Sequence, residues 1–188
     1  VFVDIGLAIE ELIEDDSAKC SILSLKGDQL FHCSAPSLDP EYCQLINGVT
    51  IGAEVGSCGT AAYRKSRVVV DNIATSPLWK NFKDLASNFN LHSCWSTPII
   101  STQAEVLGTF AIYYGYPKTP SSKDLELIDY FVHFSFIALE KKQKNRQLNQ
   151  LIQDLQVSNA KFHAITQVMP DLALIISEDG VYVDIYGA

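Results

Sequence analysis

The segment from Gly52 to Trp95 constrains the fold of this chain more than any other. It opens with glycines spaced Gly-x-x-x-Gly and a further glycine three residues later, a pattern typical of tight turns that lead into a short helix. A run of three valines predicts a strand that ends at Asp71, and Ser76-Pro77 predicts the start of another helix. The segment lacks the paired acids, clustered histidines and ordered nucleophile–base series of an enzyme. The residue pattern of this segment therefore gives no sign of a catalytic site.

Composition narrows the classes of partner. The chain has 188 residues, a formal net charge of −8 and 47% hydrophobic residues, enough for one full domain and part of another. Lysine and arginine are nowhere dense enough to bind phosphates, which argues against nucleic acid as a partner. Six acids and no base lie between Asp4 and Asp16, and we interpret them as a solvated helix face. Apolar runs fall short of the roughly 20 residues that a membrane span requires.

The cysteines indicate a reducing compartment. Their number is odd, and they show neither a Cys-x-x-Cys pair nor the spacing of a zinc site. We expect them to be reduced and cytosolic, and mostly buried as small apolar side chains. The five residues are Cys20, Cys33, Cys43, Cys58 and Cys94.

The first third of the chain predicts a helix, a hairpin and a second helix. Apolar residues at helical spacing favour a helix over residues 1–14. Two short apolar runs around Lys26-Gly27-Asp28 predict a hairpin. Asp39-Pro40 has the residue types that begin a helix, and Asn47-Gly48 those that end one.

The middle of the chain predicts short helices and three strands. Ser57 is placed to cap a helix through Tyr63, and Ser76 to cap the next one. Strands are expected at residues 68–70, 96–100 and 106–114. Gly108 inside the last of these predicts a bulge or a close approach of another backbone.

A long helix is predicted from Ser121, because Ser-x-x-Asp has the form of a capping box. Neither glycine nor proline interrupts the sequence until Pro170. From residue 148 onward, apolar residues recur seven apart, which favours a short coiled-coil linker. The alternative is one amphipathic helix that packs back on its own domain. The repeating positions are Leu148, Leu155, Phe162 and Met169, together with Leu151, Ser158 and Ile165.

The end of the chain predicts a second hairpin. Apolar runs at residues 172–176 and 181–185 flank Asp179-Gly180, a typical hairpin turn. Met169 is the one methionine, and the sequence ends at Ala188 inside this hairpin. We therefore expect the sequence to be a segment of a longer protein.

The order of these elements, with residues 52–71 and Leu107-Gly108-Thr109-Phe110, resembles that of a bacterial GAF sensor domain. The resemblance implies an α+β fold, with an antiparallel sheet of about six strands flanked by helices. A ligand pocket is then expected on one face of the sheet and the terminal helices on the other. We predict a GAF domain at residues 1–140, a coiled-coil signalling helix at 141–166 and the start of a PAS domain at 167–188.

The tail resembles the opening of a PAS domain, both at Phe162 to Ile165 and from Met169 through Tyr182. The resemblance implies a cytoplasmic sensor that precedes a histidine kinase or an enzyme that makes or hydrolyses cyclic-di-GMP. It also implies a homodimer through the first and long helices and a small-molecule ligand of unknown identity. A two-state change in the coiled coil would then carry the signal. The 188-residue sequence is not expected to have enzymatic activity of its own.

The predicted ligand site combines a glycine-rich helix start with aromatic walls. Backbone N–H groups and a hydroxyl at a helix start can receive an anion or a carbonyl, and tryptophans can enclose a small molecule. The alternative interpretation is a turn required for geometry and aromatic residues that are ordinary core. The candidate residues are Ser57, Cys58, Gly59, Thr60, Trp79, Phe82, Cys94 and Trp95.

Two other functions remain as alternatives. A domain with a filled pocket would serve only as a dimerisation spacer. Cys58-Gly59 resembles a motif of free methionine sulfoxide reductases, but the segment from Ala74 to Trp79 lacks the second cysteine that those enzymes place there. The four histidines are scattered over strand, loop and helix, so a haem or metal site stays open only as a disfavoured alternative, and the cofactor is unknown.

Overall fold

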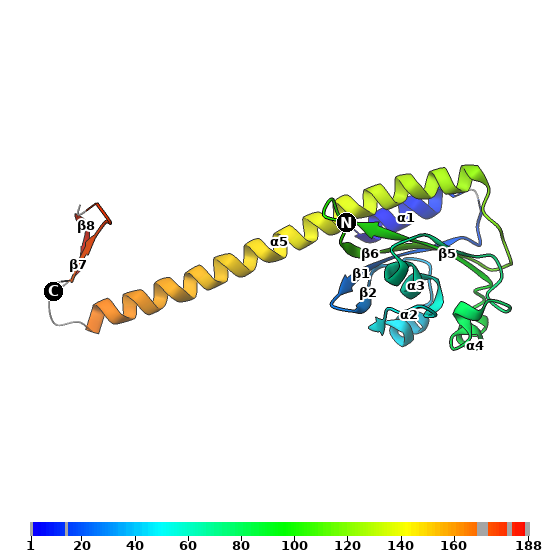
Figure 1. The fold of residues 1–188 in the computed structure, drawn as a ribbon, viewed down its shortest axis with the longest axis horizontal. Helices are drawn as coiled ribbons and strands as arrows, with labels where there is room; N and C mark the ends of the chain where they lie inside the picture. Colours follow the sequence, from blue (N-terminus) through cyan, green and yellow to red (C-terminus); the bar gives the residue numbers. More distant parts are fainter. Residues whose placement is uncertain (1, 14, 169–172, 180–181, 187–188) are drawn as a thin grey trace. The chain divides into compact units, whose positions relative to one another are not determined.

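The computed structural model describes residues 2–13, 15–168, 173–179 and 182–186. The chain divides into two compact units, residues 1–141 and 142–188, and helix α5 (Ser122–Val168) belongs to both. The first unit is an antiparallel sheet with helices on both faces (Figure 1). With the long C-terminal helix, this confirms the predicted α+β class.

The sheet has six strands in the order β3-β2-β1-β6-β5-β4, and every neighbouring pair is antiparallel. Gly108 confirms the predicted close backbone approach, because a Cβ built there would lie 1.9 Å from the carbonyl oxygen of Leu23. The strands are β1 (Lys19–Lys26), β2 (Gln29–Ser34), β3 (Val49–Thr50), β4 (Val68–Val70), β5 (Ser93–Ile100) and β6 (Val106–Tyr114).

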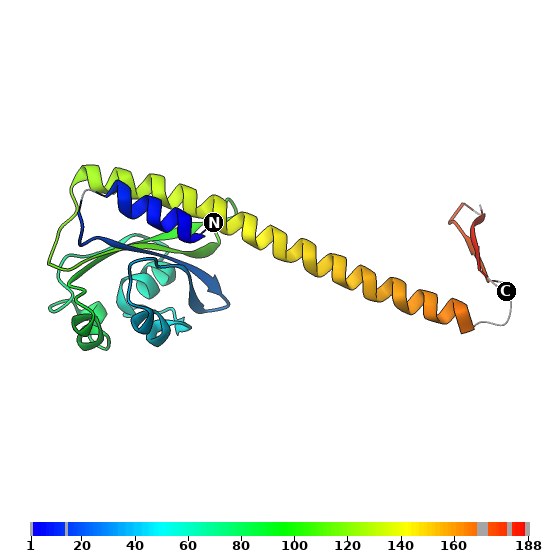
Figure 2. The ribbon, with the colours of Figure 1, turned by 180° about the vertical axis from the view of Figure 1, so that it is seen from behind.

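Helices of different kinds cover the two faces of the sheet (Figures 1 and 2). On one face α1 (Phe2–Leu12) lies beside the beginning of α5. The other face carries the short helices α2 (Pro40–Ile46), α3 (Gly56–Arg64), η1 (Pro77–Trp79) and α4 (Lys83–Asn88). The sheet therefore separates the terminal helices from the segment that the sequence marks as the site.

Each face of the sheet has its own buried core. Successive residues of a strand point to opposite faces, so β5 and β6 contribute to both cores. The core shared with α1 and α5 contains Ile22, Trp95, Phe110, Ile112 and Phe131. The core shared with the short helices contains Tyr42, Ala61, Trp79, Cys94 and Tyr113.

Two helix starts confirm their sequence signals. The Asp39 side chain accepts a 2.8 Å hydrogen bond from the backbone N–H of Glu41. Ser121 and Asp124 form the predicted capping box: each side chain accepts from the other's backbone N–H, at 3.2 and 2.8 Å. Such a box satisfies N–H groups that the first helical turn leaves without partners.

Two other predicted caps are wrong. Helix α3 begins at Gly56, after Val55, and no side chain caps it. Ser76 precedes the 3-10 helix η1 without a side-chain hydrogen bond, and α4 begins separately at Lys83. Tertiary partners occupy the hydroxyl of Ser57 instead, as described below.

The second unit consists of the later part of α5 and a hairpin of β7 (Ala173–Ile176) and β8 (Tyr182–Tyr186). Leu148, Leu151 and Leu155 are exposed along this part of α5. Met169, the last position of the predicted heptad series, lies outside the described residues, as does Gly180 of the predicted hairpin turn. Within the described chain, no helix has both the length and the apolar character needed to cross a bilayer.

Candidate functional site

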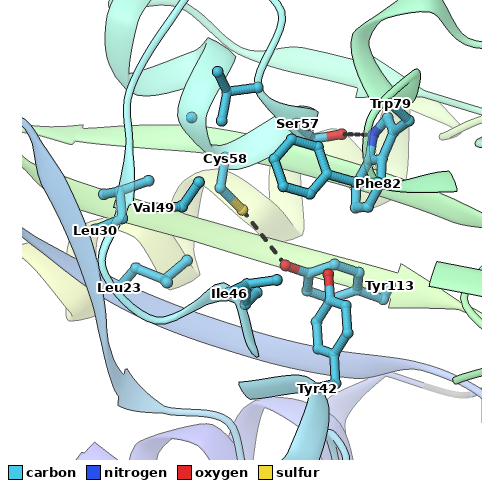
Figure 3. A pocket seen from close by; sticks show the side chains of 13 residues that line it. Leu23, Leu30, Tyr42, Ile46, Val49, Ser57, Cys58, Trp79, Phe82 and Tyr113 are labelled. Atoms are coloured by element: carbon cyan, nitrogen blue, oxygen red, sulfur yellow. Dashed lines mark hydrogen bonds between the residues drawn. The ribbon is translucent and has the colours of Figure 1, made fainter. Parts of the chain in front are cut away.

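A small cavity lies between the sheet and the short helices, at the place that the sequence marks. Its volume is about 40 Å³. That is room for a few waters or a very small molecule, since one water needs roughly 10–15 Å³ by such a measure. Figure 3 shows side chains of β1, β2, β6 and the short helices around it. The lining residues are Leu23, Leu30, Tyr42, Ile46, Val49, Val55, Gly56, Ser57, Cys58, Gly59, Trp79, Phe82 and Tyr113.

Ser57 joins the cavity wall to the sheet. Its hydroxyl donates a 3.0 Å hydrogen bond to the backbone carbonyl of Cys94. It also accepts a 3.0 Å hydrogen bond from Nε1 of Trp79 (Figure 3). The side chain is fully buried. The hydroxyl proton is thus already used, which makes Ser57 an anchor of α3 rather than the helix cap or ligand donor that the sequence suggests.

The glycines at this helix start serve close packing. Gly56 has φ +55°, and a Cβ there would lie 3.7 Å from the indole ring of Trp79. A Cβ on Gly59 would lie 2.8 Å from the side chain of Val55, closer than real Cβ contacts allow. The alternative interpretation of a glycine-rich turn required for geometry therefore accounts for both residues.

Cys58 places a thiol at the edge of the cavity. Its sulfur lies 3.5 Å from the phenolic oxygen of Tyr113 (Figure 3). The pKa of Cys58 is lowered from the ordinary thiol value because the Cys94 thiol, and then the Tyr113 hydroxyl, hydrogen-bond to its sulfur and outweigh its burial. Cys58 is therefore more thiolate-like at neutral pH than a typical cysteine.

The groups around Cys58 stay protonated. Burial raises the pKa of Cys94 well above the ordinary value, and hydrogen bonding to Cys58 adds to this effect. Burial also raises the pKa values of Tyr42 and Tyr113, whose rings meet edge to face at 6.3 Å between centroids. The lining residues, all within the described part of the chain, include no Asp, Glu, Lys or Arg. The cavity therefore suits a neutral, largely apolar molecule that can accept a hydrogen bond.

The structure brings five of the predicted site residues together: Ser57, Cys58, Gly59, Trp79 and Phe82 line the cavity. Thr60 does not, because its hydroxyl turns back to accept a 3.1 Å bond from the backbone N–H of Val55. Cys94 is buried in the sheet as a neighbour of Cys58 and does not line the cavity.

The assignment of Trp95 to the predicted site is wrong. It packs in the opposite core with Phe110 and Phe131, and its Nε1 donates a 3.0 Å bond to the carbonyl of Lys118. The reason is the alternation of side chains along β5. Since Cys94 faces the cavity side, its neighbour Trp95 faces α5.

The sequence analysis missed the walls that the sheet and α2 supply. Tyr42 and Ile46 lie one turn apart on α2, and the i, i+4 spacing of apolar residues in the predicted helix was the available signal. Tyr113 lies opposite Cys94 across the β5–β6 pair. Only the strand register reveals that contact.

Charged and titratable groups elsewhere do not form a second centre of this kind. Histidine, cysteine, aspartate and glutamate nowhere gather in threes suited to a metal ion within the described residues. The ammonium of Lys118 and the hydroxyl of Tyr116 donate hydrogen bonds to Oδ2 of Asp15, at 2.9 and 2.5 Å. These bonds hold the segment after α1 against the segment after β6.

Comparison with known proteins supports this architecture. Over 169 residues the chain is 32% identical to the methyl sulfide methyltransferase-associated sensor of Methanosarcina acetivorans, covering 88% of the chain but 16% of that protein. A domain of a two-component sensor histidine kinase protein from Sinorhizobium meliloti superposes with a TM-score of 0.63 at 14% identity, over 79% of this chain and 94% of that one.

The fold is also similar to that of an enzyme. Reduced fRMsr of Staphylococcus aureus has a TM-score of 0.58 at 17% identity, over 73% of this chain and 80% of that one. At such low identities the structural likeness shows the fold alone. The family model described as GAF domain matches residues 5–140, and the chain therefore belongs to the GAF domain family.

Proposed function

We propose that this GAF domain is a cytoplasmic sensory module. A small neutral molecule binds between α3 and the sheet, and its presence is relayed to α5. The observation that carries the proposal is a largely apolar cavity, without Asp, Glu, Lys or Arg in its lining, that is edged by a thiol and two phenols on strands whose other face contacts α5. The name of the 32% identical relative, a sensor, supports the same class of function.

The relay follows from strands that serve both cores. Cys94 faces the site and Trp95 faces the α5 side, so a shift of β5 moves both. Arg67 adds a polar connection, because its Nε donates a 2.8 Å bond to Thr97 of β5 and its guanidinium pairs with Asp129 of α5. A ligand that favours one position of α3 and β5 would thereby bias α5, as a population shift requires.

We further propose that two copies pair through α1 and α5. A groove of about 460 Å³ between these helices is lined almost entirely by apolar side chains. Leu12, Phe134 and Ile137 are 63, 57 and 48% exposed there, an apolar surface that a monomer leaves in water. A second copy would cover it, and the exposed leucines of the later α5 would continue the contact as a coiled coil.

The domains that would receive the signal are proposed from the resemblance of the tail to a PAS domain. We propose that the β7–β8 hairpin opens a PAS domain and that a histidine kinase or a cyclic-di-GMP enzyme follows in the whole protein. The chain spans 16% of the relative named as a sensor, which leaves room for such domains there.

Two alternatives differ in what the cavity would contain. A dimerisation spacer would hold only water. A free methionine sulfoxide reductase would have to bind an ammonium and a carboxylate, and the absence of charged residues from the lining disfavours that substrate. The cavity thus favours a neutral ligand over both the amino-acid substrate and an anion.

Filling the cavity tests ligand binding. Ile46 lines the cavity, whereas its neighbour Leu45 is 60% exposed, so Ile46→Phe and Leu45→Phe add the same ring inside and outside the site. Native mass spectrometry of the purified protein should show a bound small molecule in the wild type and in Leu45→Phe, and not in Ile46→Phe. A ligand at about 100 times its Kd would stabilise by roughly 2.7 kcal/mol, visible as a higher melting temperature. A wild-type protein with no bound mass would favour the spacer.

A further inference from the structure

Two cysteines distant in sequence meet behind the cavity. Cys58 lies in the first turn of α3, and Cys94 lies in β5. The hydrogen bond from Ser57 to the Cys94 carbonyl holds these two backbones together. Tyr113 pairs with Cys94 across the strands, and its hydroxyl is 3.5 Å from the Cys58 sulfur. Both thiols therefore lie beside Tyr113 on the same side of the sheet, and the pKa of each thiol responds to the other.

The pair is asymmetric in access and in acidity. Cys58 borders the cavity, whereas Cys94 is fully buried and does not. The Cys94 thiol and the Tyr113 hydroxyl stabilise the Cys58 thiolate and lower the pKa of Cys58, while burial keeps Cys94 protonated. This is the division of roles between an attacking and a resolving thiol, with Cys58 open to a small reagent.

We propose that Cys58 and Cys94 are a redox pair that a hydroperoxide converts into an intramolecular disulfide between α3 and β5. The Cys58 thiolate attacks the peroxide oxygen, which forms an S–O bond, breaks the O–O bond and leaves a sulfenic acid and hydroxide. The Cys94 thiol gives its proton to that hydroxide, which becomes water. The Cys94 sulfur then attacks the Cys58 sulfur and displaces the sulfenic oxygen as hydroxide, which takes up the proton released when Cys58 ionised and leaves as the second water. Overall, two thiols and one hydrogen peroxide give one disulfide and two waters.

The disulfide would act on the site itself. Bond formation brings the sulfurs to about 2.05 Å and fixes the first turn of α3 to β5 covalently. It also removes the thiolate that faces Tyr113 and the cavity. Oxidation would therefore change both the polarity of the cavity and the freedom of α3, without requiring that any ligand be bound.

The other thiols provide matched comparisons. Cys43 is half-buried on α2, and burial, followed by the charge of Asp39, raises its pKa. Cys20 is buried on the opposite face of the sheet, in the core with α5. Cys43→Ser is thus a control that removes a thiol of comparable exposure without touching the pair.

The experiment treats the reduced, purified chain with stoichiometric hydrogen peroxide and maps its thiols by alkylation and non-reducing peptide mass spectrometry. Wild type and Cys43→Ser should lose two thiols together and yield a Cys58–Cys94 linked peptide within one chain. Cys94→Ser should stop at a Cys58 sulfenic acid that dimedone captures, and Cys58→Ser should leave Cys94 reduced.

The wild-type peptide map shows whether the Cys58–Cys94 disulfide forms, even if a variant fails to fold. Cys94→Ala is a second variant that lacks the resolving thiol. A wild-type product in which Cys58 is oxidised without the Cys94 link would overturn the proposal. So would a cross-link between chains, or oxidation of Cys94 in Cys58→Ser.

Discussion

Replacing Ser57 with alanine tests how the site is attached to the sheet. The change removes one fully buried oxygen that both accepts from Trp79 Nε1 and donates to the Cys94 carbonyl, each at 3.0 Å. A buried donor left unsatisfied costs about 1–3 kcal/mol, and loss of the second bond adds about 0.5–1.5 kcal/mol. We therefore expect Ser57→Ala to lower the free energy of unfolding of the GAF domain by about 2–4 kcal/mol.

Urea unfolding followed by tryptophan fluorescence measures this directly, since Trp79 and Trp95 both lie in the buried cores of the domain. The slope of the transition should not change, because a lost contact alters stability rather than the surface exposed. Ser66→Ala, at an exposed site just after the same helix, is the control and should change stability by less than about 0.5 kcal/mol.

A double-mutant cycle with Trp79→Phe measures how much of this stability comes from the bond between the Trp79 indole and the Ser57 hydroxyl. If the indole N–H bond is responsible, Ser57→Ala should cost at least about 1 kcal/mol less in the Trp79→Phe background. Equal costs in both backgrounds would refute the contribution of the indole bond. A Ser57→Ala variant as stable as the wild type would refute the view that this hydroxyl anchors α3.

Two further predictions concern acid stability and assembly. Burial opposes ionisation of Asp15, but hydrogen bonds from Tyr116 and Lys118, among others, outweigh it and lower the pKa of Asp15. The stabilisation of the fold by Asp15 is therefore fully present above the unfolded pKa of about 4 and is lost progressively as the pH falls below it. Thermal melts should show that the wild type loses more stability than Asp15→Asn between neutral pH and about pH 3. Sedimentation should show a dimer at tens of micromolar that the double change Leu151→Asp, Leu155→Asp dissociates or weakens.

Each of these has a control that isolates its cause. Asp16→Asn removes an exposed neighbouring carboxylate and should keep the acid sensitivity of the wild type. Gln150→Asp and Asn159→Asp add the same two charges to exposed polar positions of α5 and should leave the dimer intact. A monomeric wild type, or a pH profile that Asp15→Asn does not alter, would contradict the corresponding argument.

Local signals in the sequence were sufficient wherever a few neighbouring residues decide the conformation. The Ser121–Asp124 box and the Asp39 cap form within one helical turn, so their residue types predict their hydrogen bonds. The close approach at Gly108 was also readable, because a glycine inside a strand leaves space that another backbone can occupy. The class of fold and the region of the candidate site came from the resemblance of the ordered elements to a GAF domain.

The composition of the site depended on contacts that join distant segments. Ser57 has the residue type of a helix cap, yet its hydroxyl hydrogen-bonds to Cys94 and Trp79, which lie 37 and 22 residues away in the sequence. Alternation along a strand requires Cys94 and Trp95 to face opposite sides, but only the packing of the helices decides which side holds the cavity.

The sequence by itself therefore determined most elements of this GAF domain, its long C-terminal helix and the segment that borders the cavity. The tertiary structure alone decided that Trp95 belongs to the α5 core, that Tyr42 and Tyr113 enclose the cavity, and that Cys58 meets Cys94. The physical reason is range. Capping, turns and periodicity depend on residues within a turn or two, whereas a cavity and a thiol pair arise where strand register and helix packing bring together residues that the sequence separates.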